Sequence, residues 1–133
     1  MAFVYANVNA LQNTQKVGDK QCVALVRHYL KSQGLKETRT WREGAKVLGN
    51  TGIAPGTAIA TFVNGRYPNK SHGNHAALYV SQDAGGIVVM DQWKDDVTKP
   101  RVSLRYLRVG GSINPDGTYP NASNNANAFS VIE

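Results

Sequence analysis

The chain has 133 residues, of which 41% are hydrophobic and 18% charged, with 15 basic against nine acidic residues. These values are typical of one globular domain, residues 1–133, and exclude a disordered tail, a coiled coil and a collagen-like chain. No apolar run approaches the roughly 18 residues of a membrane span, and the start, MAFVYANVNA, lacks the pattern of a secretory signal. The net charge of +6 favours an anionic partner such as nucleic acid, a membrane surface or cell wall.

The single cysteine, Cys22, excludes an intramolecular disulfide and a zinc or iron–sulfur site built on several thiolates. It is either a small core residue or a reactive thiol. A metal site made of His72, His75 and Asp91 would follow no known ligand spacing. We therefore predict no metal and no cofactor.

The first predicted element is a helix that begins after Asp19, which is a suitable N-cap, and ends at Gly34. Its apolar residues recur at the spacing of an amphipathic helix: Cys22, Leu25, Val26 and Tyr29. A second, shorter helix is predicted at about 41–48, because Thr40 and Glu43 have the spacing of a capping box.

The rest of the chain is predicted to form strands and turns. The four strands are expected at Thr57–Val63, His75–Val80, Ile87–Gln92 and Arg101–Val109. A loop at 64–74 separates the first two, and a turn at 81–86 joins the next two. The asparagine-rich stretch 121–127 is predicted to be irregular. A helix followed by an antiparallel meander is an α+β pattern.

Cys22 falls in the first turn of its predicted helix, where unpaired backbone N–H groups and the positive end of the helix dipole lie. This environment lowers the pKa of a thiol and makes it nucleophilic. The alternative is that Cys22 only fills the apolar stripe of the helix.

A histidine and an aspartate come together in the predicted hairpin. If Asp83 is the centre of its turn, His75 faces Asp91, with Cβ atoms about 4.5–5.5 Å apart. The carboxylate can then bond one imidazole nitrogen and leave the other free to take a proton from a thiol. A register slip of one residue would instead place the pair on opposite faces.

These segments resemble motifs of the CHAP and NlpC-like peptidases, small papain-like cysteine enzymes that cut peptidoglycan peptides. Gln21-Cys22 before Val-Ala-Leu-Val resembles their nucleophile motif. Residues 53–59 resemble their Pro-Gly-Asp turn, and residues 75–80 their His-Val-Gly-Ile-Tyr strand. Asp91 lies where CHAP members carry Glu and NlpC-like members usually carry a second His.

The resemblance implies a papain-like fold of the NlpC/CHAP type, in which the helix that carries the cysteine packs on an antiparallel meander. It implies that the Cys22 thiolate attacks an amide carbonyl, that His75 protonates the leaving amine, and that Asp91 orients His75. The backbone N–H of Cys22 would contribute to the oxyanion hole. Gln92 is the alternative third residue, because Trp93 stands where CHAP members often have Asn.

The whole chain, through the Asn-rich ending, looks closer still to a small group of bacterial proteins related to amidase effectors of type VI secretion. This resemblance implies a peptidoglycan amidase or endopeptidase that acts as a toxin, and an immunity protein in the producing cell. It also implies synthesis in the cytoplasm without a signal peptide and action in the periplasm of the target. The expected cleft walls are Trp41, Tyr79, Trp93 and His72. The three aromatic residues are explained equally well as core residues, and His72 can instead be an ordinary loop residue.

Two other classes of function are open. The basic charge also permits a nucleic-acid-binding protein, although no zinc pattern or RNA-binding aromatic motif is present. The fold also permits a catalytically silent wall-binding module, against which the joint presence of Cys22, His75 and Asp91 argues. One acid-free basic group is interpreted as a solvated face: Lys99, Arg101, Arg105 and Arg108.

Overall fold

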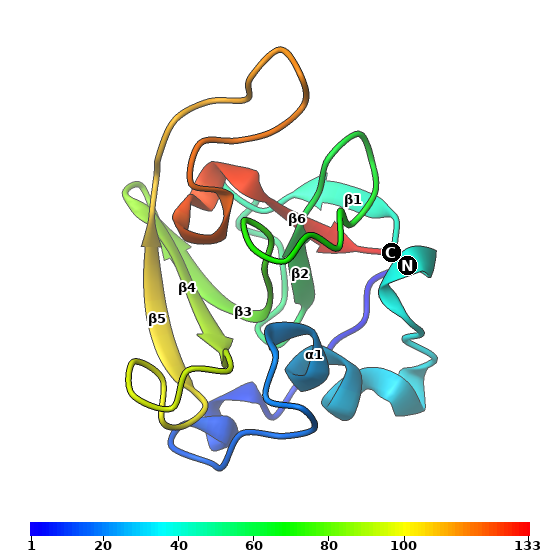
Figure 1. Ribbon diagram of the computed structural model, residues 1–133, viewed down its shortest axis with the longest axis vertical. Helices are drawn as coiled ribbons and strands as arrows, with labels where there is room; N and C mark the ends of the chain where they lie inside the picture. Colours follow the sequence, from blue (N-terminus) through cyan, green and yellow to red (C-terminus); the bar gives the residue numbers. More distant parts are fainter.

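The computed structural model describes residues 1–133, and at its centre is one six-stranded antiparallel sheet of order β1-β6-β2-β3-β4-β5 (Figure 1). The strands are β1 (Glu43–Lys46), β2 (Ala58–Thr61), β3 (Ala76–Asp83), β4 (Gly86–Asp91), β5 (Ser103–Arg108) and β6 (Phe129–Ile132). The sheet is accompanied by one α-helix, α1 (Cys22–Leu30). The predicted α+β class is confirmed. None of the helices has the length and apolar character needed to cross a membrane.

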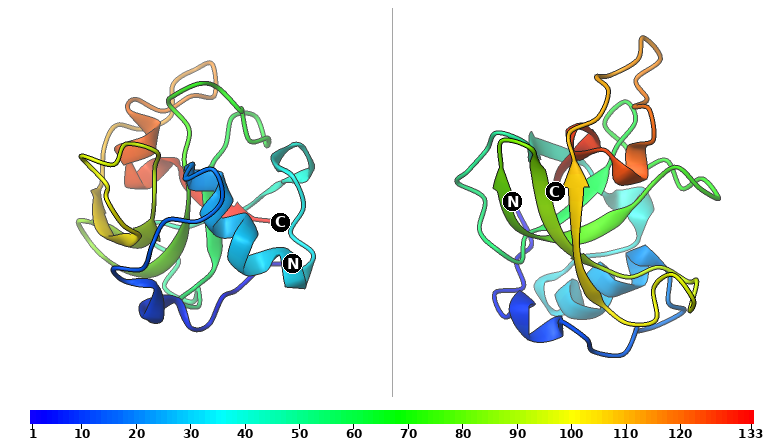
Figure 2. Two further views of the ribbon diagram at one scale, coloured as in Figure 1. Left: turned by 60° about the horizontal axis from the view of Figure 1, so that its bottom comes forward. Right: turned by 90° about the vertical axis from the view of Figure 1, so that its left-hand side faces the viewer.

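Helix α1 covers one face of the sheet (Figure 2). Its inner side chains, Leu25, Val26 and Leu30, are fully buried in a core that includes Leu78 of β3 and Met90 of β4. Burial of each such side chain contributes about 1.5–3 kcal/mol. This is the arrangement implied by the papain-like resemblance, with the cysteine at the start of a helix that packs on an antiparallel sheet.

The other face of the sheet is covered by the C-terminal segment. Tyr79, Ile87 and Val89 lie in a second core together with Ala126 and Ala128, which precede β6. Because successive side chains of a strand point to opposite faces, a strand covered on both sides is apolar throughout. This explains why β2, β3 and β4 were visible in the sequence as apolar runs.

The predicted helix at 41–48 is wrong, because residues 43–46 form the edge strand β1 and pair with β6. The residues of the supposed capping box have other partners. Thr40 donates its hydroxyl hydrogen bond to the carbonyl of Glu37, and Glu43 accepts one from Ser130 of β6 at 2.7 Å. Pairing with a distant strand therefore prevails over the local helix signal.

The asparagine-rich stretch 121–127 contains only short 3₁₀ turns, but the strand that follows it was not predicted. Residues 129–132 form β6, whose four residues are all buried between β1 and β2. Its entry is ordered by Asn125, which accepts a hydrogen bond from the N–H of Asn127 and donates to the carbonyls of Gly111 and Pro120. These asparagines thus build a tight turn before the strand.

The hairpin of β3 and β4 has a different register from the predicted one. Asp83 pairs with Gly86 at a tight turn, so β3 runs three residues further than expected. From the turn toward the open end of the hairpin, the strand β3 next has a bulge at residues 79–81, and on the far side of this bulge Leu78 pairs with Met90. At the open end of the hairpin the register differs from the prediction by two residues. A shift of two keeps every side chain on its predicted face.

Candidate active site

Cys22 is the first residue of α1 rather than a residue of its interior. Gln21 occupies the N-cap position with an extended backbone, and Asp19, the predicted cap, instead accepts a hydrogen bond from the N–H of Gln21 at 3.0 Å. The backbone N–H of Cys22 therefore has no acceptor within the helix. The thiol and this free N–H lie at the positive end of the helix dipole.

The loop that leads into Cys22 is held by Gln92, which is fully buried. The amide nitrogen of Gln92 donates to the carbonyls of Val17 and Gln21 at 3.0 and 2.8 Å, and its oxygen accepts from the N–H of Val17 at 2.9 Å. All of these partners belong to the loop before the helix. Gln92 therefore holds the loop before Cys22 and makes no hydrogen bond to His75.

The structure places Asp91 beside His75. The Nε2 atom of His75 lies 2.8 Å from Oδ2 of Asp91, and both residues are buried. The contact is made diagonally across the hairpin rather than between paired residues, because of the register shift of two. The backbone of His75 is held by Thr61 of β2, whose hydroxyl accepts its N–H at 3.0 Å. With Nε2 bound to Asp91, Nδ1 is left to face the thiol.

Asp91 also binds two cations that the sequence analysis did not assign to the site. Lys99 Nζ lies 2.8 Å from Oδ1 and Arg105 Nε lies 2.9 Å from Oδ2. Both cations also lie near the ring of Trp93, at 4.8 and 5.1 Å from its centroid. In the sequence, Lys99 and Arg105 belong to a basic group that contains no acidic residue. Only the folded sheet shows that these two members of the group point toward Asp91.

Electrostatics favour a charged pair of carboxylate and imidazolium. Burial raises the pKa of Asp91, but the hydrogen bond and charge of His75 and the charges of Arg105 and Lys99 outweigh it and hold this pKa well below its usual range. Burial lowers the pKa of His75, but its hydrogen bonds to Asp91 and Cys22 prevail and raise it to about 9. His75 is therefore protonated at neutral pH.

The thiol is surrounded by hydrogen-bond donors. Burial raises the pKa of Cys22, but the hydrogen bond and charge of His75, the backbone N–H of Ala76 and the hydroxyl of Tyr67 bring it below its ordinary value. Tyr67 lies 3.9 Å from the sulfur, and its oxygen accepts a hydrogen bond from Asn74 at 3.1 Å. These contacts favour a thiolate–imidazolium pair.

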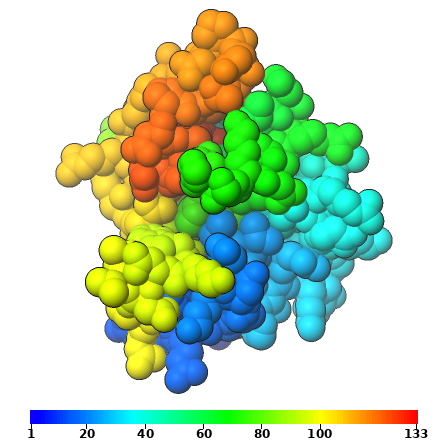
Figure 3. All heavy atoms as spheres, in the orientation of Figure 1, coloured from blue at the N-terminus to red at the C-terminus, as the bar shows by residue number.

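A cleft of about 380 Å³ opens over this pair. The residues that line it are Gln21, Cys22, Ser71, His72, Gly73, Asn74, His75, Trp93, Arg105, Ser123 and Asn124. The segments near residues 20, 70, 95 and 120 meet on the same side of the molecule (Figure 3). No lining residue is acidic. Of the predicted cleft walls, His72 and Trp93 therefore lie in the cleft.

The other two predicted cleft walls, Trp41 and Tyr79, belong to the cores. Trp41 is 1% exposed, and its indole N–H donates to the carbonyl of Lys36. Its ring packs on Tyr67 at 5.1 Å between centroids, so Trp41 supports the site from below. Tyr79 is buried in the core on the other face of the sheet, where its hydroxyl accepts a hydrogen bond from Gln82. Neither residue is available to a substrate in the cleft.

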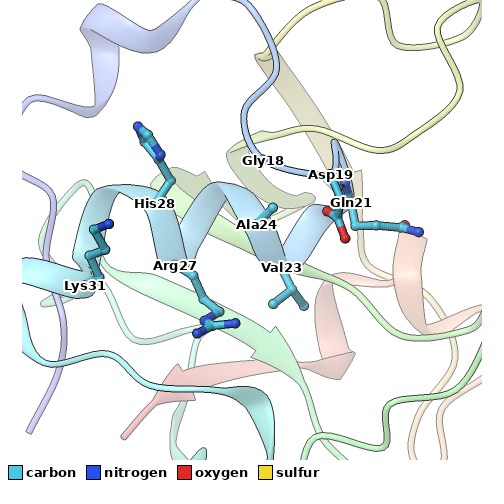
Figure 4. A pocket seen from close by; sticks show the side chains of 8 residues that line it. All are labelled: Gly18, Asp19, Gln21, Val23, Ala24, Arg27, His28 and Lys31. Atoms are coloured by element: carbon cyan, nitrogen blue, oxygen red, sulfur yellow. Dashed lines mark hydrogen bonds between the residues drawn. The ribbon is translucent and has the colours of Figure 1, made fainter.

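A second hollow, of about 450 Å³, lies along the outer side of α1 and shares Gln21 with the cleft. Figure 4 shows that its polar side chains diverge: Arg27 projects to one side of the helix and His28 to the other. No group of reacting side chains converges there. The candidate active site is therefore the cleft at the start of α1, which Cys22 and His75 line.

A cysteine at the start of a helix, with a histidine and a carboxylate on two adjacent strands, is the arrangement of the cysteine peptidases that the sequence resembles. Comparison with known families and structures is consistent with this class. The domesticated amidase effector 2 family matches residues 3–132, which is nearly the whole chain. The chain belongs to this family.

Individual relatives cover the chain to different extents. A type VI secretion amidase effector 2 protein of Salmonella typhi is 57% identical over the full length of both chains. A domesticated amidase effector 2 of the tick Ixodes scapularis is 38% identical over 75% of this chain and 66% of its own length. A solved structure of type 6 secretion amidase effector 2 (Tae2) superimposes with a TM-score of 0.94, covering 98% of this chain and 94% of that one at 57% identity. The resemblance to type VI amidase effectors is confirmed.

Proposed function

We propose that this protein is a cysteine amidase that cleaves amide bonds of peptidoglycan peptides. The observation that carries the proposal is that Cys22, at the start of α1, and His75, which is bonded to Asp91 at 2.8 Å, line the same open cleft. Membership of an amidase effector family supports an amide as the bond that is cut.

Acylation uses the charged pair directly. The Cys22 thiolate attacks the carbonyl carbon, a C–S bond forms, and the carbonyl oxygen becomes an oxyanion. The free backbone N–H of Cys22 donates a hydrogen bond to that oxyanion. His75 then gives its Nδ1 proton to the amide nitrogen, the C–N bond breaks, and the amine leaves.

Deacylation returns the site to its starting state. A water molecule attacks the thioester while the now neutral His75 takes its proton, the C–S bond breaks, and the acid product leaves. Asp91 keeps its charge throughout and holds the imidazole through Nε2, so that Nδ1 stays aimed at the sulfur and the leaving nitrogen.

We propose further that the protein acts in the periplasm of a target cell after delivery by a type VI secretion machine, as the names of its relatives suggest. A producing cell then needs an immunity protein that binds it. Expression of the protein with an added periplasmic signal should lyse bacteria when Cys22 is present and leave them intact when it is Ala. Lysis by both forms would exclude cleavage as the cause.

The direct test is digestion of purified peptidoglycan followed by mass spectrometry of the muropeptides. The wild type should add one water per cleaved amide, and Cys22→Ala and His75→Ala should each yield no such product while they melt close to the wild type. His72→Ala is the matched control from the same cleft. If His75→Ala keeps most of the activity and His72→Ala loses it, His72 is the base. A steep salt-dependent affinity for DNA without hydrolysis would support the nucleic-acid alternative.

A further inference from the structure

Arg105 occupies an unusual place, because it touches both the site and the wall of the cleft. Its Nε donates to Asp91 Oδ2, the oxygen that also binds His75 Nε2. Its Nη1 donates to Asn124 Oδ1 at 2.6 Å, and its Nη2 to the carbonyl of Ser123 at 3.3 Å. Through the shared oxygen, Arg105 Nε and His75 Nε2 lie within about 6 Å of each other.

The guanidinium of Arg105 has unused hydrogen-bond donors. An arginine has five N–H groups, and the three hydrogen bonds of Arg105 leave one N–H on each terminal nitrogen without a partner in the chain. The side chain is 20% exposed and lines the cleft. These two N–H groups can donate hydrogen bonds to an anionic acceptor that enters the cleft, such as a carboxylate.

The charges of the site leave one positive charge uncompensated. Lys99, which is buried outside the cleft lining, neutralises Asp91 through the oxygen that Arg105 does not use. The Cys22 thiolate and the His75 imidazolium neutralise each other. Arg105 is then in excess, and no Asp or Glu lines the cleft to balance it.

The guanidinium is also rigid before any ligand arrives. The ring of Trp93 lies 5.1 Å from the guanidinium carbon of Arg105. The three hydrogen bonds of Arg105 tie it to Asp91 of β4 and to the turn at residues 122–124. Asn124 is itself held by Asn121 at 3.0 Å. A group held in this way loses little conformational entropy on binding, so most of the interaction energy appears as affinity.

We infer that Arg105 binds a carboxylate of the substrate near the scissile amide, so that the cleft selects peptides with a free acid at that position. This inference rests on the proposed amidase function and specifies the chemistry of its substrate. Peptidoglycan peptides carry free carboxylates beside their amide bonds, and conversion of these to primary amides removes the charge while it preserves the shape. Arg105 is thus a specificity-determining residue rather than a further acid or base.

The test measures binding without turnover. A cross-linked muropeptide with free carboxylates, and the same peptide with those groups converted to primary amides, are titrated by calorimetry into Cys22→Ala. The free acid should bind about 10- to 100-fold more tightly, the range expected for hydrogen bonds to a charged group. In Cys22→Ala combined with Arg105→Gln, the two peptides should bind alike. Arg108→Gln, the same change at an exposed residue of the same strand, should keep the discrimination.

Two outcomes would overturn the inference. One is equal binding of both peptides to Cys22→Ala. The other is an Arg105→Gln variant that weakens both peptides by the same factor, which would make Arg105 a positioning residue for Asp91. Arg105→Lys keeps a cation beside Asp91 and provides a folded variant if Arg105→Gln unfolds; it should lose most of the discrimination. If the wild type cleaves both peptides at equal rates, the selectivity is refuted and the amidase function stands. If Cys22→Ala binds the free acid more tightly but the wild type cleaves neither peptide, the amidase function is refuted and the selectivity stands.

Discussion

Replacing Asp91 by Asn keeps the shape of the side chain at the centre of the site and removes its charge. Asp91 is fully buried, and three groups depend on that charge: His75, Lys99 and Arg105. Asn still offers an oxygen to His75 Nε2, so the orientation of the ring survives in part. It cannot neutralise the two cations, whose side chains are only 5% and 20% exposed.

The size of the effect follows from the burial. Removal of one partner from a buried ion pair costs about 3–5 kcal/mol, because the other charge stays buried without compensation. For a domain of this length, where 1 kcal/mol corresponds to about 3–5 °C, Asp91→Asn should melt about 10–25 °C lower. The pKa of His75 should fall as well, and loss of the general acid should lower kcat/KM about 10²- to 10⁴-fold. Asp91→Ala, which also removes the orientation of His75, should lose more activity.

The assay is urea unfolding followed by tryptophan fluorescence, together with kcat/KM on one muropeptide. Asp83→Asn is the matched control, since Asp83 is an exposed carboxylate of the same hairpin, and it should change the free energy of unfolding by less than about 1 kcal/mol. A second substitution, Lys99→Met, should restore about 1–3 kcal/mol to Asp91→Asn by removing one unpaired buried cation. If Asp91→Asn unfolds within 1 kcal/mol of the wild type, or if Lys99→Met destabilises it further, this account of the ion cluster is refuted.

Three further predictions follow from the same contacts. Iodoacetamide should alkylate native Cys22 well below pH 8, and His75→Ala should move the labelling to above pH 8; labelling only after unfolding would mean an inert core thiol. Because folding raises the pKa of His75, its protonation stabilises the fold fully below about pH 6.5, and this stabilisation is lost as the pH rises through about 9. Folding lowers the pKa of Cys22, so the contribution of Cys22 to the unfolding free energy changes with pH in the opposite direction. Above pH 6.5 the unfolding free energy of Cys22→Ala should therefore fall more steeply with rising pH than that of the wild type; parallel curves would contradict the coupling. Gln92→Leu should lower stability by about 2–4 kcal/mol, because it leaves backbone groups of Val17 unpaired, and should lower kcat at nearly constant KM; an equal rise in KM would place Gln92 in substrate binding.

The central hairpin shows why a sequence can indicate a contact without giving its register. The apolar runs identified β3 and β4, and their alternation placed His75 and Asp91 on one face. The bulge at residues 79–81 was not visible, since nothing in the sequence marks the extra residue. The turn lies three residues out of the predicted register, and the bulge reduces this to two at the open end, an error that preserved the face and left the pair within reach diagonally.

The edge of the sheet and the tail were missed for a different reason. Strands β1 and β6 have four residues each, and each is defined by partners far away in the chain, such as Glu43 with Ile132. Local patterns carry no information on such pairings, so a capping-box spacing was enough to suggest a helix. For the same reason, Lys99 and Arg105 could not be separated from exposed cations of the same group.

The end of β4 positions both groups of the proposed catalytic pair, Cys22 and His75. Asp91 and Gln92 are adjacent and point to opposite sides. Asp91 holds the imidazole of His75, while Gln92 holds the loop that presents Cys22. The placement of Cys22 relative to His75 therefore depends on the last residue of β4 and the residue after it, although Cys22 and His75 lie 53 positions apart in the chain. Any change that shifts the end of β4 along its own axis should move both groups together and leave their separation nearly constant.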